Sequence, residues 1–310
     1  MSAINLIFGG ANLGNLPSLN TPENLKEVFS VLTSHGIVGI DSAQLYGESE
    51  TLLGATQAGE RFILDTKWMG GVQPGWATRE NMVHSAKECI RKLGVKRVDV
   101  FYIHFPDAQT PIAETLAGVE EVYRLGLFQR FGLSNYQADD VQKIFHHCKE
   151  KGYVLPTVFQ GNYSAVARRS ETALFPTLRE LGIAFRAYSP LAGGFLTKTP
   201  QQIMAGAGRF NDDTYGGMYK QMFVKPVYLE ALKKWNTVAK VEGCSSAELG
   251  YRWAVYHSPL KKELGDGVLV GASSLGQLKL TLEGIAHGKL SDEAVKAIDE
   301  IWAGVKHDAP

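Results

Sequence analysis

The sequence predicts an α/β protein with the (β/α)₈ TIM-barrel architecture. Short β-rich runs alternate with helix-type patterns along almost the whole chain, and eight such runs can be counted. Most of them are continuously apolar, as expected for parallel strands that are covered on both faces. Eight successive β/α units favour closure of the sheet into a barrel. Since barrels of this type typically take roughly 250 residues, we expect residues 1–310 to form a single domain.

The expected strands are residues 6–8, 38–41, 62–67, 98–103, 128–133, 157–160, 183–188 and 267–270. Helical spacing of apolar residues follows Thr21-Pro22 and recurs at Met82, Ala86, Cys89 and Leu93. Ser245 and Glu248 have the spacing of a capping box, and Ser291 is placed to begin the last helix. Residues 189–225 show no regular pattern. A loop of that length in a compact domain is usually functional or disordered.

Composition argues against several classes of protein. The 32 basic residues balance 32 acidic ones, so nucleic acid and anionic membrane surfaces are poor candidate partners. No apolar run approaches the ~18 residues of a membrane span, and the first ten residues lack the charged start of a signal peptide. The three cysteines have no zinc-type spacing. We therefore expect a cytoplasmic protein with reduced thiols and no metal.

Four chemically reactive side chains lie at or just after the ends of three successive predicted strands: Asp41, Tyr46, Lys67 and His104. In a (β/α)₈ barrel the active site forms at the C-terminal strand ends, so these groups should converge at one mouth. Each also has an ordinary explanation. Asp41 could cap a helix, Tyr46 could pack on the rim, and His104 could be a core histidine. Lys67 could be a solvated strand end or a Schiff-base lysine. Four such coincidences together favour a shared catalytic site.

The segments around these residues read DSAQLYGESE, LDTKW and DVFYIHFPD, and FGLSNY, VFQGNYS, AYSPLAGGFLTK, GRF and VGASSLGQL follow in order. In this order and spacing the chain resembles the aldo-keto reductases, most of all the branch of aflatoxin-aldehyde and succinic-semialdehyde reductases. The resemblance covers nearly the whole chain. No GxGxxG motif opens a helix after a strand, so nicotinamide binding is implied by this resemblance and not by a Rossmann fingerprint.

The resemblance implies reduction of aldehydes or ketones by hydride transfer from NADPH, with Tyr46 as proton donor. Lys67 beside the phenol would favour the phenolate and so make Tyr46 a stronger acid, and Asp41 would keep Lys67 charged and oriented. His104 would stabilise charge that develops on the carbonyl oxygen.

The resemblance also implies a site for NADPH or NADP⁺. Ser134 and Asn135 would hold the nicotinamide carboxamide with Gln160 beside them, and Tyr188 would stack on the ring. The other expected contacts are Asp41, Ser189, Pro190, Leu191, Gly193, Gly194, Leu196, Lys198, Arg209, Gly271, Ala272, Ser273, Ser274 and Gln277. Family members often carry Arg at the position of Gln277, and different residues at those of Leu280 and Thr281, so this chain departs from the family pattern at the expected adenine contacts.

Aromatic residues near the expected mouth are candidates for a substrate pocket, although each could equally be a rim or core aromatic. The main candidates are Trp68, Phe105 and Tyr219, followed by Trp76, Tyr215, Met218 and Phe223. We expect a small-molecule carbonyl substrate and a monomer or homodimer. The alternative function is that of potassium-channel β subunits, which are similar to this family: a regulatory or binding barrel that holds NADPH with little turnover.

Overall fold

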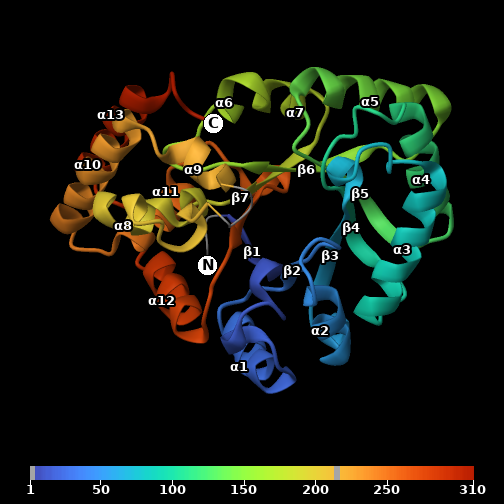
Figure 1. Ribbon diagram of the computed structural model, residues 1–310, viewed down its shortest axis with the longest axis horizontal. Coiled ribbons are helices and arrows are strands. Elements are labelled where there is room, and N and C mark those ends of the chain that lie inside the picture. Colours follow the sequence, from blue (N-terminus) through green and yellow to red (C-terminus); the bar gives the residue numbers. More distant parts are fainter. Residues whose placement is uncertain (1–3, 213–216) are drawn as a thin grey trace.

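The computed structural model describes residues 4–212 and 217–310. Within them, parallel strands close into a barrel in chain order, with the eighth strand pairing back to the first (Figure 1). The strands are β1 (Asn5–Gly9), β2 (Gly39–Asp41), β3 (Ile63–Trp68), β4 (Val98–Ile103), β5 (Phe128–Ser134), β6 (Pro156–Asn162), β7 (Ala184–Tyr188) and β8 (Gly267–Val270). The predicted (β/α)₈ barrel is confirmed, and each predicted strand is found within two residues of its expected ends.

Helices surround this barrel (Figure 1). They are α1 (Pro22–Ser34), α2 (Ser49–Ala55), α3 (Arg79–Leu93), α4 (Ile112–Arg124), α5 (Ala138–Lys151), α6 (Ser170–Ala173), α7 (Phe175–Glu180), α8 (Pro200–Met204), α9 (Met218–Phe223), α10 (Pro226–Glu242), α11 (Ser246–Tyr256), α12 (Leu275–Ala286) and α13 (Asp292–Val305). None of the helices in the described part of the chain combines the length and the apolar character that crossing a membrane requires.

Side-chain caps are found where Thr21, Ser245 and Ser291 were predicted to begin helices, but the capping box predicted at Ser245 is incomplete. The hydroxyl oxygens of Thr21 and Ser291 accept backbone N–H groups of α1 and α13. Ser245 caps α11 in the same way. The predicted capping box there is nevertheless incomplete, because the Glu248 carboxylate instead accepts a hydrogen bond from Arg252 (3.0 Å) in the next helical turn.

The stretch 189–225, predicted to be irregular, contains short helical elements. Two 3₁₀ segments, Ala192–Thr197 and Gly208–Phe210, alternate with α8 and α9, and a complete capping box at Thr199 opens α8. Each element is too short to show a helical period in the sequence. Phe195 stacks on Phe223 at 5.5 Å, and both side chains are fully buried. Phe223 is therefore a core residue and not a wall of a substrate pocket, while Tyr215 lies outside the described residues.

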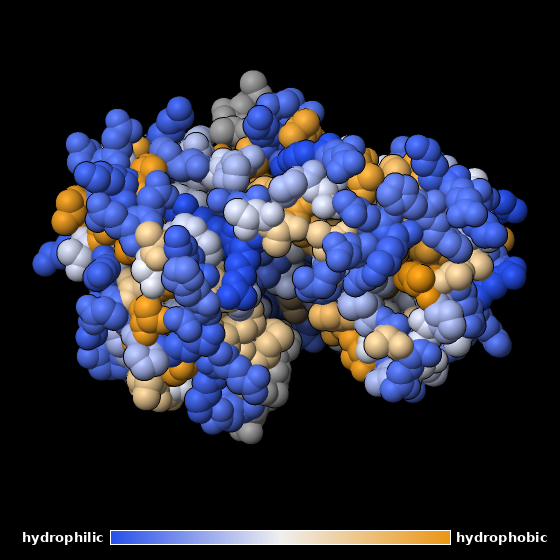
Figure 2. Space-filling view, turned by 90° about the horizontal axis from the view of Figure 1, so that it is seen from above, coloured by the Kyte–Doolittle hydropathy of each residue, from blue (hydrophilic) through white to orange (hydrophobic). Residues whose placement is uncertain are grey.

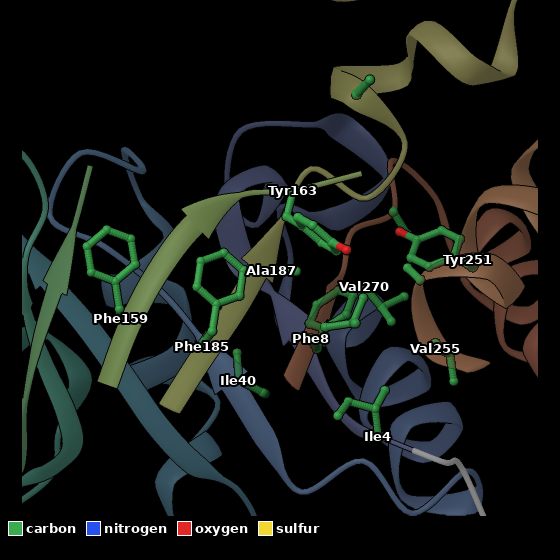
Figure 3. Packing of buried hydrophobic residues seen from close by; sticks show 14 of the residues in the cluster. Ile4, Phe8, Ile40, Phe159, Tyr163, Phe185, Ala187, Tyr251, Val255 and Val270 are labelled. Carbon is green, nitrogen blue, oxygen red and sulfur yellow. The ribbon is translucent and has the colours of Figure 1, made fainter. Parts of the chain in front are cut away.

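The main apolar core lies between the strands and the helices. Figure 3 shows part of it, with Phe8, Ile40, Phe159, Phe185 and Val270 contributed by five different strands. All of these side chains are at most 2% exposed. Because side chains alternate between the two faces of a strand, the residues between them point toward the barrel axis.

Several polar side chains face the axis, beside a small apolar cluster of Val100, Tyr102 and Val158. Asp65 on β3 reaches Arg186 on β7, and Asp41 on β2 reaches Gln160 on β6. Since neither pair of strands is adjacent, both contacts cross the barrel interior. Tyr102 of β4 also lies in the interior, where a Cβ atom on Gly132 would come within 2.3 Å of its ring. Because Gly132 on β5 has no side chain, the ring of Tyr102 fits beside it.

Candidate active site

Lys67 is the centre of a hydrogen-bonded cluster at the C-terminal ends of β2 and β3. Its Nζ donates to Asp41 Oδ2 (2.5 Å), to the carbonyl oxygen of Ser42 (2.8 Å) and to the hydroxyl oxygen of Tyr46 (3.3 Å). Both members of the ion pair are buried, at 0% exposure for Lys67 and 1% for Asp41. An ammonium has three N–H donors, so these three acceptors satisfy all of them.

The Asp41 carboxylate keeps Lys67 protonated. Burial alone lowers the pKa of the ammonium, but the attraction of the Asp41 carboxylate and the hydrogen bonds to Asp41 and Tyr46 outweigh this, so the pKa is raised above its ordinary value. The other oxygen of Asp41 accepts from Gln160 Nε2 (2.8 Å), which fixes the carboxylate from the opposite side of the barrel. Asp41 thus orients Lys67 against Tyr46.

Tyr46 lies in the loop after β2, between Lys67 and His104. The ammonium lies 4.7 Å from the centre of its ring, and the His104 ring meets it edge-on at 5.8 Å between centroids. His104 follows β4 and is anchored by its backbone N–H, which donates to the carbonyl oxygen of Trp68 (2.9 Å). This contact ties the start of the loop after β4 to the end of β3, and so holds the His104 ring beside Tyr46.

The His104 imidazole is neutral. Burial, and then the positive charge of Lys67, lower its pKa to about 2. Within residues 4–212 and 217–310 its Nδ1 is buried and has no hydrogen-bond partner. The ring stacks on Phe105 at 4.6 Å between centroids, which fixes its plane. A neutral imidazole carries one N–H donor, and the His104 ring lies beside the ring of Tyr46.

The predicted carboxamide residues form one tethered group. Asn135 Nδ2 donates to the carbonyl oxygen of His104 (2.9 Å) and to Ser134 Oγ (3.1 Å), and its Oδ1 accepts from the Tyr188 hydroxyl (2.8 Å). Burial, and then the nearby Tyr219 and Tyr46, raise the pKa of Tyr188, so this phenol remains a donor. Gln160 faces Asp41, as described above.

Backbone strain gathers at the predicted cofactor site. Among the described residues, four that are not glycine have a positive φ, and three of them are Asn135 (64°), Ser189 (54°) and Ala192 (51°). Such conformations are costly for side chains with a Cβ and often mark ligand-binding sites. Gly193 and Gly194 continue the same turn with φ of 67° and 97°. The turn thus keeps an uncommon backbone shape where the resemblance places the pyrophosphate.

Two cationic side chains lie beside this turn. Lys198 Nζ donates to the carbonyl oxygen of Gly194 (3.2 Å), and burial and then the charge of Arg209 lower the pKa of Lys198. Arg209 Nη1 donates to the hydroxyl of Tyr219 (3.1 Å). Two neighbouring positive charges suit a phosphate group.

Tyr219 supports the turn from the other side. Its hydroxyl lies 3.3 Å from Ser189 Oγ, and a Cβ on Gly193 would come within 2.1 Å of its ring. At 7% exposure the ring belongs to the packing of the predicted cofactor loop.

The segment after β8 forms a second candidate part of the cofactor site. Gln277 Oε1 accepts from the backbone N–H (2.9 Å) and the hydroxyl (2.6 Å) of Ser273, while Ser274 caps α12. A Cβ on Gly271 would meet nothing within 4 Å, so there is open space beside this backbone. Leu280 is 70% exposed on α12. This segment therefore offers exposed backbone and Gln277, and has no arginine at the position of Gln277.

Some predicted contacts have buried side chains. Leu196 is fully buried in the core, so only its backbone is near the turn, and Pro190 and Ala272 are also buried. Trp68 is fully buried as well, on the face of β3 opposite Lys67, and has no surface with which to line an open pocket. Phe105 is partly exposed beside His104 and remains the pocket candidate closest to the catalytic cluster.

Sequence reasoning missed three buried polar residues below this cluster: Asp65, Tyr102 and Arg186. Each is an inward-facing residue inside a predicted strand, and Asp65 stands two positions before Lys67. A charged residue within an apolar strand is rarely buried unless it is paired. The charged residues Asp65 and Arg186 within apolar strands were therefore the feature of the sequence that indicated a buried pair. The carbonyl oxygen of Ser42 was also missed, since a main-chain acceptor leaves no mark in the sequence.

The surface is hollowed between two lobes in the view from above (Figure 2). Hydrophilic and moderately hydrophobic residues both border this hollow (Figure 2).

Comparison with known proteins agrees with this architecture. The model of the aldo/keto reductase family matches residues 5–303. The chain is 38% identical to "Oxidoreductase sirO" of Leptosphaeria maculans, over 98% of this chain and 95% of that protein. It is 36% identical to human "Aflatoxin B1 aldehyde reductase member 2", over 98% and 88%. It is 33% identical to human "Aldo-keto reductase family 7 member A3", over 98% and 95%. The chain therefore belongs to the aldo/keto reductase family and is an oxidoreductase.

Proposed function

We propose that this protein reduces small aldehydes or ketones to alcohols with NADPH, and that Tyr46 donates the proton. The observation that carries the proposal is the contact of the Tyr46 hydroxyl with a buried, charged Lys67 at 3.3 Å, beside a neutral His104. The relatives named as aldehyde reductases make an aldehyde the first substrate to test.

The roles of the residues follow from charge. When a carbonyl oxygen accepts a proton, the donor is left negative, and the ammonium of Lys67 stabilises that phenolate. Asp41 keeps Lys67 charged and directed at Tyr46, and Gln160 holds Asp41. This chain of contacts supports the proposal that Tyr46 donates the proton, with Lys67, Asp41 and Gln160 in supporting positions.

His104 would bind the substrate carbonyl. It is a neutral donor, and its buried Nδ1 has no partner among the described residues. It can therefore give a hydrogen bond to the oxygen without competing with Tyr46 for the role of acid. Phe105, stacked on the imidazole, would restrict its rotation.

NADPH, when bound, would supply the hydride to the carbonyl carbon. The residues proposed to hold it are Asn135 with Ser134 and Tyr188 at the nicotinamide end, and Lys198 with Arg209 at a phosphate. The strained turn at Ser189 and Ala192, and the open backbone at Gly271, fit a ligand that approaches the main chain closely.

The geometry argues against a Schiff-base role for Lys67. A nucleophilic lysine needs an unprotonated amine and usually a lowered pKa. Here the pKa is raised, and the ammonium donates to three acceptors. Borohydride in the presence of a carbonyl substrate should therefore leave Lys67 unmodified.

Tyr46→Phe tests the proposed function. Loss of the proton donor should lower the rate of aldehyde reduction by ~10²–10⁴, while NADPH still binds with little change in affinity. Turnover is measured by the loss of NADPH absorbance and binding by quenching of protein fluorescence. Tyr123→Phe, at a 42% exposed position on α4, is the matched control and should behave as the unaltered protein.

Reduction by Tyr46→Phe at the rate of the unaltered protein would refute the assignment of the proton donor. An unaltered protein that binds NADPH but turns over none of a panel of aldehydes and ketones would instead support a regulatory barrel.

A further inference from the structure

A second buried ion pair lies in the barrel interior. Arg186 of β7 donates through Nη1 to Asp65 of β3, and the side chains are 9% and 2% exposed. Asp65 also accepts the backbone N–H of Val100 (2.9 Å). The pair crosses the barrel between strands that are not neighbours, so its position is set by closure of the barrel.

This pair is coupled to the catalytic cluster by the strand register. Asp65 is the registered partner of Asp41, and Tyr102 is the registered partner of Lys67. The Tyr102 hydroxyl accepts from Arg186 Nη1 (3.2 Å), while Lys67 Nζ lies 5.8 Å from the centre of the Tyr102 ring. Tyr102 therefore lies beside a member of each ion pair.

The charges of these two pairs balance. Asp41 and Asp65 supply two negative charges, and Lys67 and Arg186 supply two positive ones. Burial raises the pKa of Asp65, Arg186 lowers it, and the carboxylates of Asp41 and Asp99 raise it further. Arg130, paired with Asp99, is the next cation below. Toward the mouth, Tyr46 is faced by Lys67, His104 and Tyr188.

We propose that Arg186 and Asp65 are positioning residues that set the acidity of Tyr46 by balancing the buried charge beneath Lys67. The inference rests on the proposed role of Tyr46, because it names what tunes that phenol. Neither residue touches the substrate; both act through the electrostatic field at Lys67 and Tyr46.

The proposal predicts opposite effects for the two halves of the pair. Asp65→Asn leaves the positive charge of Arg186 unbalanced, which favours the Tyr46 phenolate and lowers the pH at which it titrates. Arg186→Gln leaves a negative charge once Asp65 has ionised, which disfavours the phenolate and raises that pH. For charges roughly 10 Å apart at an effective dielectric constant of about 20, each shift is about one pH unit.

The experiment follows tyrosinate formation by ultraviolet difference spectroscopy in the protein without added cofactor. Subtracting from each protein the titration of its counterpart that also carries Tyr46→Phe isolates the contribution of Tyr46, because Tyr102 and the other tyrosines are then common to both. We expect Asp65→Asn to titrate about one unit lower, Arg186→Gln about one unit higher, and the double variant close to the unaltered protein. Arg186→Lys, which retains the charge, should also lie close to the unaltered protein.

A merely structural role would not produce shifts of opposite sign. Identical titration of Tyr46 in both single variants, or shifts in the same direction, would overturn the proposal. If one single variant does not fold, the direction found in the other decides, since the expected signs differ. Tyr46→Phe that still reduces aldehydes would refute the proposed function and leave these titration shifts unaffected, so the two failures can be told apart.

Discussion

The neutral state of His104 has a measurable consequence for stability. Burial and Lys67 hold the pKa of this imidazole at about 2 in the folded protein, whereas an unfolded histidine titrates near ~6.5. The unfolded chain therefore binds one more proton than the folded chain at pH values between the two. A lowered folded-state pKa gives stability that is present above ~6.5 and is lost as the pH falls below it.

The size of the loss follows from this difference. Below ~6.5 the free energy of unfolding decreases by about 1.4 kcal/mol for each pH unit on account of this one group. At pH 5 the contribution amounts to about 2 kcal/mol. His104 is 8% exposed, so solvent screening is small.

The assay compares urea unfolding of the unaltered protein and of His104→Gln at pH 7.5 and at pH 5.0, followed by circular dichroism. The unaltered protein should lose about 2 kcal/mol more than the variant over this interval. Groups shared by both proteins cancel in the comparison. His307→Gln, which removes an exposed imidazole near the C-terminus, is the matched control and should lose as much as the unaltered protein. An equal loss in His104→Gln and in the unaltered protein would refute the reasoning.

Further expectations concern the ion pair and the cofactor loop. Lys67→Met leaves the Asp41 charge buried without its partner and should lower the free energy of unfolding by ~3–5 kcal/mol. The double variant Asp41→Asn/Lys67→Met should lose less of this free energy. Lys143→Met, at an exposed position, is the control and should lose almost none. A single Lys67→Met as stable as the unaltered protein would contradict the buried pair. Arg209→Ala should weaken NADPH binding. The loss of affinity should be larger for NADPH than for NADH if the guanidinium contacts the 2′-phosphate, and equal for both if it contacts the pyrophosphate. Arg91→Ala on α3 is the control. Unchanged affinity for both cofactors would remove Arg209 from the site. Saturating NADPH should protect the amides of residues 189–212 and 217–225 from hydrogen exchange while those near Lys67 change little, and identical exchange with and without NADPH would show that this segment is not a cofactor clamp.

Parts of the site were accessible from the sequence because they depend on strand ends. The strand ending at Asp41, the strand carrying Lys67 and the strand before His104 are apolar runs with clear limits, and parallel strands place their C-terminal ends together. The structure brings these residues and Tyr46 into one cluster. Trp68, in contrast, does not line a pocket, because alternation along β3 turns its buried side chain to the face opposite Lys67.

The sequence by itself determined the barrel, because hydrophobic periodicity is a local property of the chain and eight β/α units have few other ways to bury it. It also determined which chemical groups stand at the mouth. Only the tertiary structure decided which atoms meet inside. Asp41 divides its two oxygens between Lys67 and Gln160, and Arg186 finds Asp65 at a separation of 121 residues. Such pairs depend on strand register and on closure of the barrel, which bring together side chains that no local pattern relates.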